Sequence, residues 1–401
     1  MKKVIVIGGG ASGLISAIYS SLNNNEVIIL ERNNKCGKKL LMTGNGRCNY
    51  WNQNQDIKHY HSTENILLKN IINGQNQKEI LNFFNRIGII PKIKDGWYYP
   101  YSNQAISINY ALIKEAKLSK VKIITDTFVK EIKKEKNKFK IITDKKNYEC
   151  DYVILATGSK AMPITGSDGN GYNLIKSFNH SIIKPLPALT ALKSDQLYMK
   201  DWSGIRTEVK IKYEDKIEKG EIQLTNYGIS GICVFNLSYK IAKEIEQNKK
   251  VFVTIDFLPW LKLNNEEFKK WIIERNKILK NRNILELFDG ILNYKLVLFL
   301  LKINKIDKDK KWLDLTIKEQ EKIINSLKNF KLNIIGTNNF DNCQVCSGGV
   351  SLKEINLSTM ESLKIKNLYI IGELLDVNGD CGGYNLSFAW ISGMLAGKSI
   401  K

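Results

Sequence analysis

Residues 1–31 contain a glycine-rich turn between two apolar runs. Val4–Ile7 leads into Gly8-Gly9-Gly10-Ala11-Ser12-Gly13, and a second apolar run, Val27–Leu30, ends at Glu31. In such a strand–turn–helix–strand unit, glycine amides and a helix N-terminus bind a pyrophosphate, and the acid after the second strand accepts from a ribose hydroxyl. The apolar residues 14–19 supply the helix. The spacing therefore predicts a dinucleotide-binding unit.

Two later strand-to-glycine turns favour FAD over NAD as the dinucleotide. The run 153–155 ends at Ala156-Thr157-Gly158, and the run 368–371 ends at Gly372-Glu373. Ligands of an open parallel sheet bind at the carboxyl ends of its strands, so we expect the three turns to face one crevice. FAD extends from the first turn to a contact near the C-terminus, where we expect Glu373 to meet the ribityl chain.

A further glycine cluster directly precedes the last predicted helix, 386–397. It consists of Gly379, Gly382 and Gly383 and is followed by Tyr384 and Asn385. The backbone amides and the positive end of that helix could face the flavin ring and stabilise negative charge on it. The alternative is a structural C-terminal strand and helix that bind no ligand.

The composition is that of a globular protein, and its charge leaves two interpretations open. The 401 residues are 43% hydrophobic, which suits two or three domains. A net charge of +21 attracts polyanions such as RNA. However, Lys outnumbers Arg by 55 to 6, a bias that an AT-rich genome produces without any nucleic-acid partner. A generally basic, solvated surface is therefore the alternative.

The cellular location also follows from composition. No apolar run approaches the roughly 20 residues that span a bilayer, and the run after Lys2-Lys3 is too short for a signal peptide. We therefore expect a cytoplasmic protein with no membrane partner. Seven scattered cysteines fit reduced thiols better than a disulfide framework.

The elements that must position these turns follow from hydrophobic periodicity. Residues 35–52 predict a long functional loop, and Trp97–Pro100 predicts an aromatic turn. Further along, the patterns predict helices over 63–87 and 105–118, strands over 121–125 and 128–131, a hairpin over 139–149, a β region over 188–253 and a helical region over 264–329. The C-terminal segment, 347–401, repeats the pattern of the opening unit, with a buried strand that ends in a glycine turn and is followed by a helix.

Several long strings together resemble the BaiN/RdsA (YhiN/YtfP-like) flavoproteins from end to end. Besides the opening turn they are Lys38–Asn49, Ala156–Gly158, Pro163–Tyr172, Thr225–Gly231, Gly348–Val350, Thr359–Ser362 and Gly372–Asn385. The resemblance implies an α/β fold with a Rossmann-like FAD-binding domain of the two-dinucleotide-binding flavoprotein type. We place that domain at 1–187 and 345–401. It would be interrupted by a small β-barrel at 188–256 and 331–344 and by a helical insertion at 257–330.

The resemblance and the glycine turns together give the expected FAD contacts. These are Gly8, Gly9, Gly10, Ala11, Ser12, Gly13, Glu31, Arg32, Lys38, Lys39, Gly46, Arg47, Cys48, Val129, Ala156, Thr157, Gly158, Gly372, Glu373, Asp376, Gly383, Tyr384 and Asn385. No second Gly-x-Gly-x-x-Gly follows a strand. We therefore expect NAD(P)H to visit the flavin transiently as hydride donor.

The resemblance implies one reaction with more than one substrate. Members have been assigned to dihydrouridine formation in 23S ribosomal RNA, to reduction of bile-acid-like enones and to amine oxidation. The first two add a hydride to the β-carbon and a proton to the α-carbon of a conjugated carbonyl, which in uracil are C6 and C5. We expect hydride transfer from NAD(P)H-reduced FAD to C6 of a uracil in 23S ribosomal RNA.

Two features favour RNA, and the alternatives remain open. The net charge of +21 suits RNA, and the aromatic residues 97–101 offer surfaces for an unstacked base. Ordinary packing would explain the same aromatic residues. A small-molecule enone reductase, an amine oxidase and a non-catalytic flavin-dependent RNA-binding or sensor protein are the rival functions, and the oligomeric state is open.

The 38–49 segment contains the predicted proton donor. Cys48 follows Gly46 and Arg47, and a thiol kept protonated by its surroundings can act as general acid. A buried structural thiol is the alternative. Arg47 could clamp a phosphate with two hydrogen bonds. Lys38 and Lys39 are further phosphate contacts or simply solvated charges.

The remaining polar motifs are ambiguous. Cys343-x-x-Cys346 departs from the family pattern, which has small or hydroxyl residues there, and no helix pattern follows it, so we do not favour a redox disulfide. No second Cys/His pair exists to complete a zinc site, so we expect no metal. We expect His59 and His61 to be solvated. Asp376 and Asp380 could bind substrate or cap the last helix.

Overall fold

The computed structural model describes residues 1–280 and 282–401, with the backbone alone for Ile66. Its contacts divide the chain into two units. Unit 1 is Met1–Ala188 together with Asn339–Lys401, and unit 2 is Leu189–Asn338. Unit 1 is thus built from two stretches of chain that flank unit 2 in the sequence. The finer division of 188–344 into a barrel and a helical part stays a prediction.

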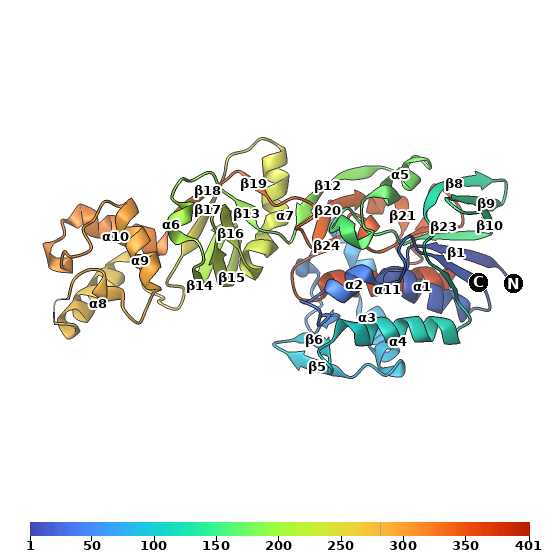
Figure 1. Ribbon diagram of the computed structural model, residues 1–401, viewed down its shortest axis with the longest axis horizontal. Coiled ribbons are helices and arrows are strands. Elements are labelled where there is room, and N and C mark those ends of the chain that lie inside the picture. The colour runs from blue at the N-terminus through green and yellow to red at the C-terminus, as the bar shows by residue number, and fades with distance from the viewer. Residues whose placement is uncertain (281) are drawn as a thin grey trace. The chain divides into compact units, whose positions relative to one another are not determined.

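A seven-stranded sheet forms the centre of unit 1 (Figure 1). Its strand order is β21 (Ile355–Asn356), β22 (Glu361–Ser362), β23 (Leu368–Ile370), β11 (Tyr152–Leu155), β1 (Lys3–Ile7), β2 (Glu26–Leu30) and β7 (Lys122–Ile124). The strands from β23 to β7 are parallel. Their nearly continuous apolar sequences follow from burial on both faces of such a sheet. Because β1, β11 and β23 are parallel, the three glycine turns that follow them lie at one edge.

Helices pack around this sheet. They are α1 (Ala11–Ser21), α2 (Lys38–Met42), α3 (Gly74–Arg86), α4 (Ala105–Leu118), α5 (Asn170–Lys176) and α11 (Tyr384–Ser399). Helix α11 is buried along most of its length, and it packs directly against α1. A Cβ at Gly393 would lie 2.4 Å from Ile15 Cγ2 and 2.5 Å from the Ser12 carbonyl oxygen. The absence of a side chain at Gly393 is therefore what lets the two helices approach so closely.

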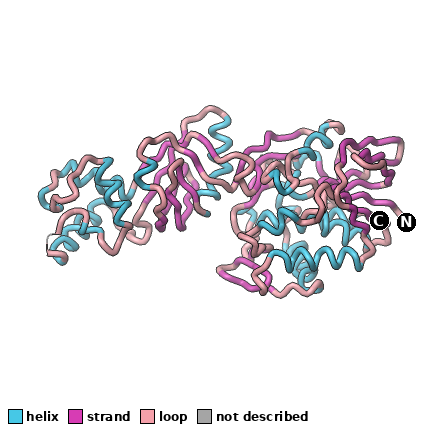
Figure 2. The backbone as a smooth tube through the Cα atoms, in the orientation of Figure 1, coloured by secondary structure: helices cyan, strands magenta, loops and turns pink. Residues whose placement is uncertain are grey.

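Four small sheets complete unit 1, drawn as magenta strands in Figure 2. They are β8 (Val129–Glu135) with β9 (Lys138–Thr143) and β10 (Tyr148–Cys150), β12 (Ile182–Ala188) with β20 (Val345–Val350), β3 (Trp51–Asn52) with β5 (Pro91–Lys94) and β6 (Trp97–Pro100), and β4 (Tyr60–His61) with β24 (Asn378–Gly379). The last pair joins a segment near the start of the chain to one near its end.

Unit 2 contains a seven-stranded antiparallel sheet. Its order is β18 (Phe330–Ile334), β17 (Val251–Asp256), β14 (Arg206–Tyr213), β15 (Lys216–Leu224), β16 (Gly228–Ser230), β13 (Leu192–Lys193) and β19 (Gly336–Thr337). Its helices are α6 (Met199–Trp202), α7 (Ile232–Glu246), α8 (Asn265–Ile278), α9 (Tyr294–Ile303) and α10 (Ile317–Lys328). Side chains of the sheet and of α8, α9 and α10 share one apolar core.

The predicted elements are mostly present, with four corrections. Residues 38–42 form α2 inside the segment predicted as a loop, and Trp97–Pro100 is a strand rather than a turn. The helix predicted over 63–87 is divided into a 3-10 helix at Asn65–Asn70 and α3, because Asn73 caps the N-terminus of α3 through a side-chain hydrogen bond. The β region over 188–253 contains the 15-residue helix α7. Its apolar residues follow a helical period, which the neighbouring strand patterns obscured.

No helix among the described residues combines the length and the apolar character that a membrane crossing requires.

The close approach of α1 and α11 gives a testable prediction. Gly393→Ala would place a Cβ inside the contact distance of Ile15 and Ser12, and such overpacking costs about 1–3 kcal/mol. Urea denaturation followed by circular dichroism should show this loss. Gly74→Ala is the matched control, because Gly74 has open space around it on the exposed first turn of α3. Equal stability of the two variants would contradict the packing argument.

Candidate functional site

The glycine turn after β1 has a backbone that few other residues could adopt. Gly8 has a φ of +105°, and a Cβ there would lie 2.4 Å from the carbonyl oxygen of Ala156. Helix α1 then begins at Ala11, and no side chain caps its first amides. Uncapped amides at the positive end of a helix bind anions such as a pyrophosphate. The structure thus has the geometry that the sequence predicts for residues 8–13.

The Glu31 carboxylate is fixed against this turn. Its Oε2 accepts a hydrogen bond from the Gly9 amide at 2.8 Å, and its Oε1 accepts from the amide and the side chain of Asn33 at 2.8 and 2.7 Å. A carboxylate offers about four acceptor positions, so one remains for an incoming hydroxyl group. Although it is only 6% exposed, Glu31 thus has the partners and the free position that a ribose-binding acid needs.

Glu373, in the glycine turn after β23, accepts hydrogen bonds from two polar side chains. Its Oε2 accepts from Lys39 Nζ at 2.6 Å and from the Ser159 hydroxyl at 3.1 Å. All three residues come from different elements, since Lys39 is in α2, Ser159 follows Gly158 after β11, and Glu373 follows β23. The turns of 156–158 and 372–373 are therefore linked directly, and Lys39 is an ion-pair partner rather than a solvated charge.

The packing of α1 on α11 sets the separation of two uncapped helix N-termini. Gly393 meets Ser12 and Ile15, and Gly397 meets Ser16 and Tyr19, so the two helices run in the same direction. Helix α11 therefore begins about seven residues before α1, or about 10 Å along the common axis. Its N-cap, Gly383, has a φ of +96° and no side-chain cap. Two anion-attracting ends at this separation fit an elongated cofactor with one charged group near each.

Unpartnered buried polar atoms lie on or beside the glycine turns that follow β11 and β23. Among the described residues, Thr157 Oγ1, the Tyr172 hydroxyl and Asp376 Oδ1 are buried without a hydrogen-bond partner. Tyr172 interacts electrostatically with Glu373 and Asp376. Burial raises its pKa, and Cys346 and the two carboxylates raise it further, so it remains a hydrogen-bond donor. Buried polar groups are rarely left unpaired, and a polar ligand such as the ribityl and phosphate portion of FAD would satisfy them.

The other expected FAD contacts are placed as follows. Asn385 holds Gly379 through both its amide and its carbonyl group, at 2.8 and 2.9 Å. Arg32 pairs with Asp168 at 2.6 Å, and the Val129 carbonyl accepts weakly from Asn170. Lys38 donates to Asn33 at 3.0 Å, beside Glu31. Gly46 and Arg47 are exposed, and the Arg47 guanidinium lies over the Tyr99 ring.

The Cys48 thiol is enclosed in the core of unit 1. It is 0% exposed, and burial raises its pKa to about 12. A thiol in this setting stays protonated, but it has no solvent-facing side from which to reach a ligand. The structure thus favours the structural alternative for Cys48 that the sequence left open.

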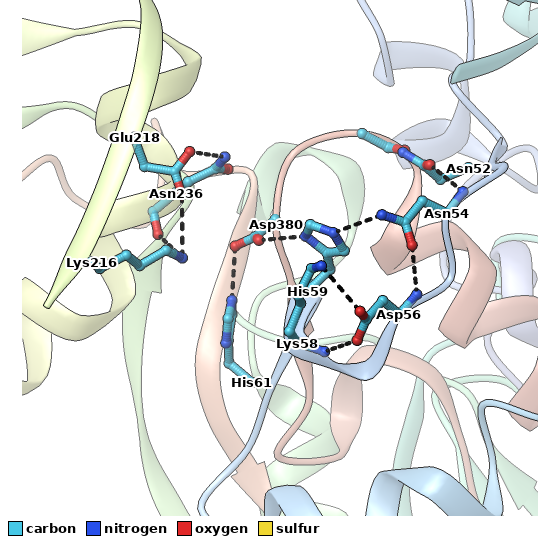
Figure 3. A network of polar contacts seen from close by, with 12 residues as sticks. Asn52, Asn54, Asp56, Lys58, His59, His61, Lys216, Glu218, Asn236 and Asp380 are labelled. Carbon is cyan, nitrogen blue, oxygen red and sulfur yellow. Dashed lines mark hydrogen bonds and ion pairs between the residues drawn. The ribbon is translucent and has the colours of Figure 1, made fainter. Parts of the chain in front are cut away.

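A polar cluster that the sequence did not reveal lies beside the 379–385 segment (Figure 3). Asp380 Oδ2 is 3.1 Å from His59 Nδ1, and Asp380 Oδ1 is 2.8 Å from His61 Nε2. The Asp380 amide donates to the His59 carbonyl, which continues the pairing of β4 with β24. His59 also stacks on Tyr384, with ring centroids 4.6 Å apart. The expectation that both histidines are solvated is therefore wrong.

The same geometry decides between two roles for the acids. Helix α11 has Gly383 as its N-cap and no side-chain cap, so neither Asp376 nor Asp380 caps the last helix. Asp376 is fully buried and accepts from the Thr63 amide at 2.7 Å. Among the described residues, no group of three His, Cys, Asp or Glu side chains is arranged to hold a metal ion.

The Glu31 geometry generates a prediction. Glu31→Ala removes an acceptor for a ribose hydroxyl and leaves the Gly9 amide unpaired, and a charged hydrogen bond is worth about 1.5–3 kcal/mol. FAD affinity, measured by flavin fluorescence titration, should fall about 10- to 100-fold. Glu26→Ala, an exposed change on β2, the strand that precedes Glu31, should bind FAD normally. Unchanged affinity in Glu31→Ala would refute the assignment.

The family model described as "HI0933-like protein Rossmann domain" matches residues 2–399. The 3-dehydro-bile acid delta(4,6)-reductase of Clostridium scindens is 38% identical and covers 100% of this chain and 99% of its own length. The ribosomal RNA dihydrouridine synthase of Escherichia coli is 25% identical, with 99% and 97% covered. A solved structure of the open conformation of a flavocytochrome c3 fumarate reductase is 14% identical at a TM-score of 0.48, with 100% of this chain and 78% of that chain covered. The chain thus belongs to the HI0933-like family of FAD-dependent oxidoreductases, as the resemblance predicted.

Proposed function

We propose that this protein is an FAD-dependent reductase of a carbon–carbon double bond conjugated to a carbonyl group, and that its substrate is a uracil base of 23S ribosomal RNA. The observation that carries the reaction class is the placement of the His59–Asp380–His61 cluster directly beside the 379–385 segment. This cluster can hold a proton next to the expected flavin site. The two kinds of curated relative, a bile-acid reductase and a dihydrouridine synthase, both have names that denote saturation of such a bond.

Two groups of residues would carry the reaction. One group, the cofactor side, would bind FAD, and the other, the proton side, would donate the proton to the substrate. When bound, FAD would supply the hydride. Glu31, the turn 8–13, Glu373 and the N-terminus of α11 would hold it, because these groups present the acceptors and amides that a dinucleotide requires. NAD(P)H would reduce it in a transient encounter.

We assign the proton side to His59 rather than to Cys48. The His59 side chain is 24% exposed, whereas Cys48 is sealed in the core. Asp380 Oδ2 lies 3.1 Å from Nδ1 of His59, and this contact orients the ring. Stacking on Tyr384 fixes the ring plane. Nε2, which lies 3.3 Å from the Asn54 side-chain nitrogen, would exchange that contact for the substrate and deliver the proton to its α-carbon.

The β3–β6–β5 sheet supports RNA as the substrate. Trp97 lies beside the glycine cluster, since a Cβ at Gly382 would be 3.2 Å from its ring. Lys92 and Lys94 are exposed on the neighbouring strand, opposite Tyr99 and Trp97. Aromatic faces beside lysines suit an unstacked base with its flanking phosphates.

Total charge gives less support than this local arrangement. Residues 189–338 contain 28 Lys and Arg against 20 Asp and Glu, and the rest of the chain contains 33 against 20. The excess is therefore spread over both units in proportion to their length. A basic RNA-binding insertion does not follow from it.

A second candidate substrate is a small-molecule enone. The 38% identity to the bile-acid reductase exceeds the 25% identity to the Escherichia coli dihydrouridine synthase, and this observation favours it. The two candidates share the flavin and the proton donor. They differ in whether the surface formed by Lys92, Lys94, Trp97 and Tyr99 binds the substrate.

Flavin reoxidation separates the candidates. We expect NAD(P)H to reduce the purified flavoprotein without oxygen, and 23S ribosomal RNA lacking dihydrouridine to reoxidise it faster than a steroid enone does. Lys92→Gln with Lys94→Gln should lower the slope of log affinity for RNA against log salt by about 2 and leave enone reoxidation unchanged. Lys138→Gln with Lys145→Gln makes the same charge change on the β8–β10 sheet and its turn and should have little effect. Faster reoxidation by the enone would contradict the RNA proposal. Oxidation of amines would favour the amine oxidase, and no turnover at all would favour the non-catalytic sensor protein.

The proton-donor assignment predicts opposite results for two substitutions. His59→Gln should leave reduction by NAD(P)H intact but lower product formation about 10²–10⁴-fold, the usual value of general acid catalysis. Cys48→Ala should retain product formation, apart from any loss of stability. Single-turnover kinetics that follow flavin reduction and product separately would measure both. If Cys48→Ala is reduced normally yet forms no product, the donor is Cys48 after all.

A further inference from the structure

Cys343 and Cys346 lie side by side in the interior of unit 1. They are 1% and 3% exposed, and they form a small apolar cluster with Ala161 and the ring of Phe340. The Cys343 thiol donates to the Phe340 carbonyl at 3.5 Å and also interacts with the Cys346 thiol. The two cysteines are therefore close neighbours in one enclosed cluster.

The Cys346 sulfur is surrounded by groups that stabilise a thiolate. It interacts with the Cys343 thiol, the Ser159 side chain and the Lys160 amide, and the Lys39 ammonium lies nearby. The interaction with Cys343 is the largest effect, and it lowers the pKa of Cys346 while raising that of Cys343. One sulfur is thus prepared to react and the other to remain protonated, a division typical of redox dithiols.

The same groups connect the cysteines to Glu373. Ser159 and Lys39 both donate to Glu373 Oε2, at 3.1 and 2.6 Å. Tyr172 interacts with Cys346 and with Glu373. Strand β20, which contains Cys346, also runs beside the 372–375 turn. The cysteine pair therefore borders the turn expected to hold the flavin.

We propose that Cys343 and Cys346 form a redox-active pair that exchanges two electrons with the FAD bound at Glu373, an inference that rests on the flavin binding proposed above. In one direction the two thiols lose two electrons and two protons and form one S–S bond, and oxidised FAD takes up the two electrons and two protons. In the other direction reduced FAD returns them and the S–S bond breaks. The pair would hold a second two-electron equivalent beside the flavin.

Burial determines the electron partner. A protein thiol must reach a sulfur atom to exchange with a disulfide, and sulfur atoms this deeply enclosed do not allow that approach. A cofactor inserted between the turns at 156–158 and 372–373 needs no such access. The flavin is therefore the partner, whereas an external thioredoxin-like protein is not.

Anaerobic dithionite titration of the flavin-loaded full chain, oxidised beforehand in air so that the oxidised flavin takes the electrons of the dithiol, tests this inference. Wild type should accept about four electrons per flavin, whereas Cys343→Ser and Cys346→Ser should each accept about two. Cys150→Ser, which removes another buried thiol from unit 1, should still accept about four. Mass spectrometry after alkylation should find Cys343 and Cys346 linked only in the oxidised wild type. Wild-type uptake of about two electrons, with both thiols alkylated, would overturn the proposal.

Absorbance spectroscopy tests contact with the flavin. A Cys346 thiolate beside oxidised FAD should give a long-wavelength charge-transfer band in Cys343→Ser that is absent in Cys346→Ser. Absence of the band in both variants would overturn direct exchange. A protein that retains no FAD would overturn the proposed cofactor and this inference together. FAD binding with uptake of about two electrons would overturn the redox pair alone.

Discussion

The site depends on how closely the backbone of unit 1 packs at its glycines. A Cβ at Gly13 would lie 1.9 Å from the carbonyl oxygen of Gly8, and Gly393 and Gly397 leave no room between α11 and α1. This packing fixes α1 at the edge of the sheet and sets the N-terminus of α11 about 10 Å from that of α1 along the helix direction. The two uncapped helix ends, with Glu31 and Glu373 nearby, follow from that one constraint. Side chains at these positions would separate the helix ends from the turns they serve.

Much of the cofactor side could be predicted from the sequence because its signals are local. The turn 8–13, the acid at 31 and the turn at 372–373 each occupy a few consecutive residues, and parallel strands bring their ends to one edge. The proton side could not be predicted in this way. His59 and His61 meet Asp380 only through the pairing of β4 with β24, which joins segments near opposite ends of the chain. No local pattern marks two such short strands. Helix α7 and the short α2 were missed for the opposite reason, since neighbouring loop and strand patterns outweighed a true helical period.

The cysteine pair shows how position changes the interpretation of a motif. Cys343-x-x-Cys346 lacks the following helix of thioredoxin-like sites, which argued against redox chemistry from sequence alone. In the structure its sulfur atoms share Lys39 and Ser159 with Glu373. The hydride, proton and dithiol functions would then come from separate elements of unit 1: the glycine turns, the β4–β24 pair and β20.

The most direct test of the substrate assignment is the dihydrouridine content of 23S ribosomal RNA, measured by mass spectrometry in cells with and without this gene. Our account predicts the loss of a single dihydrouridine in the absence of the gene and its return when the gene is restored. An unchanged dihydrouridine profile would contradict the assignment to RNA and would leave reduction of a small-molecule enone as the function of the same site.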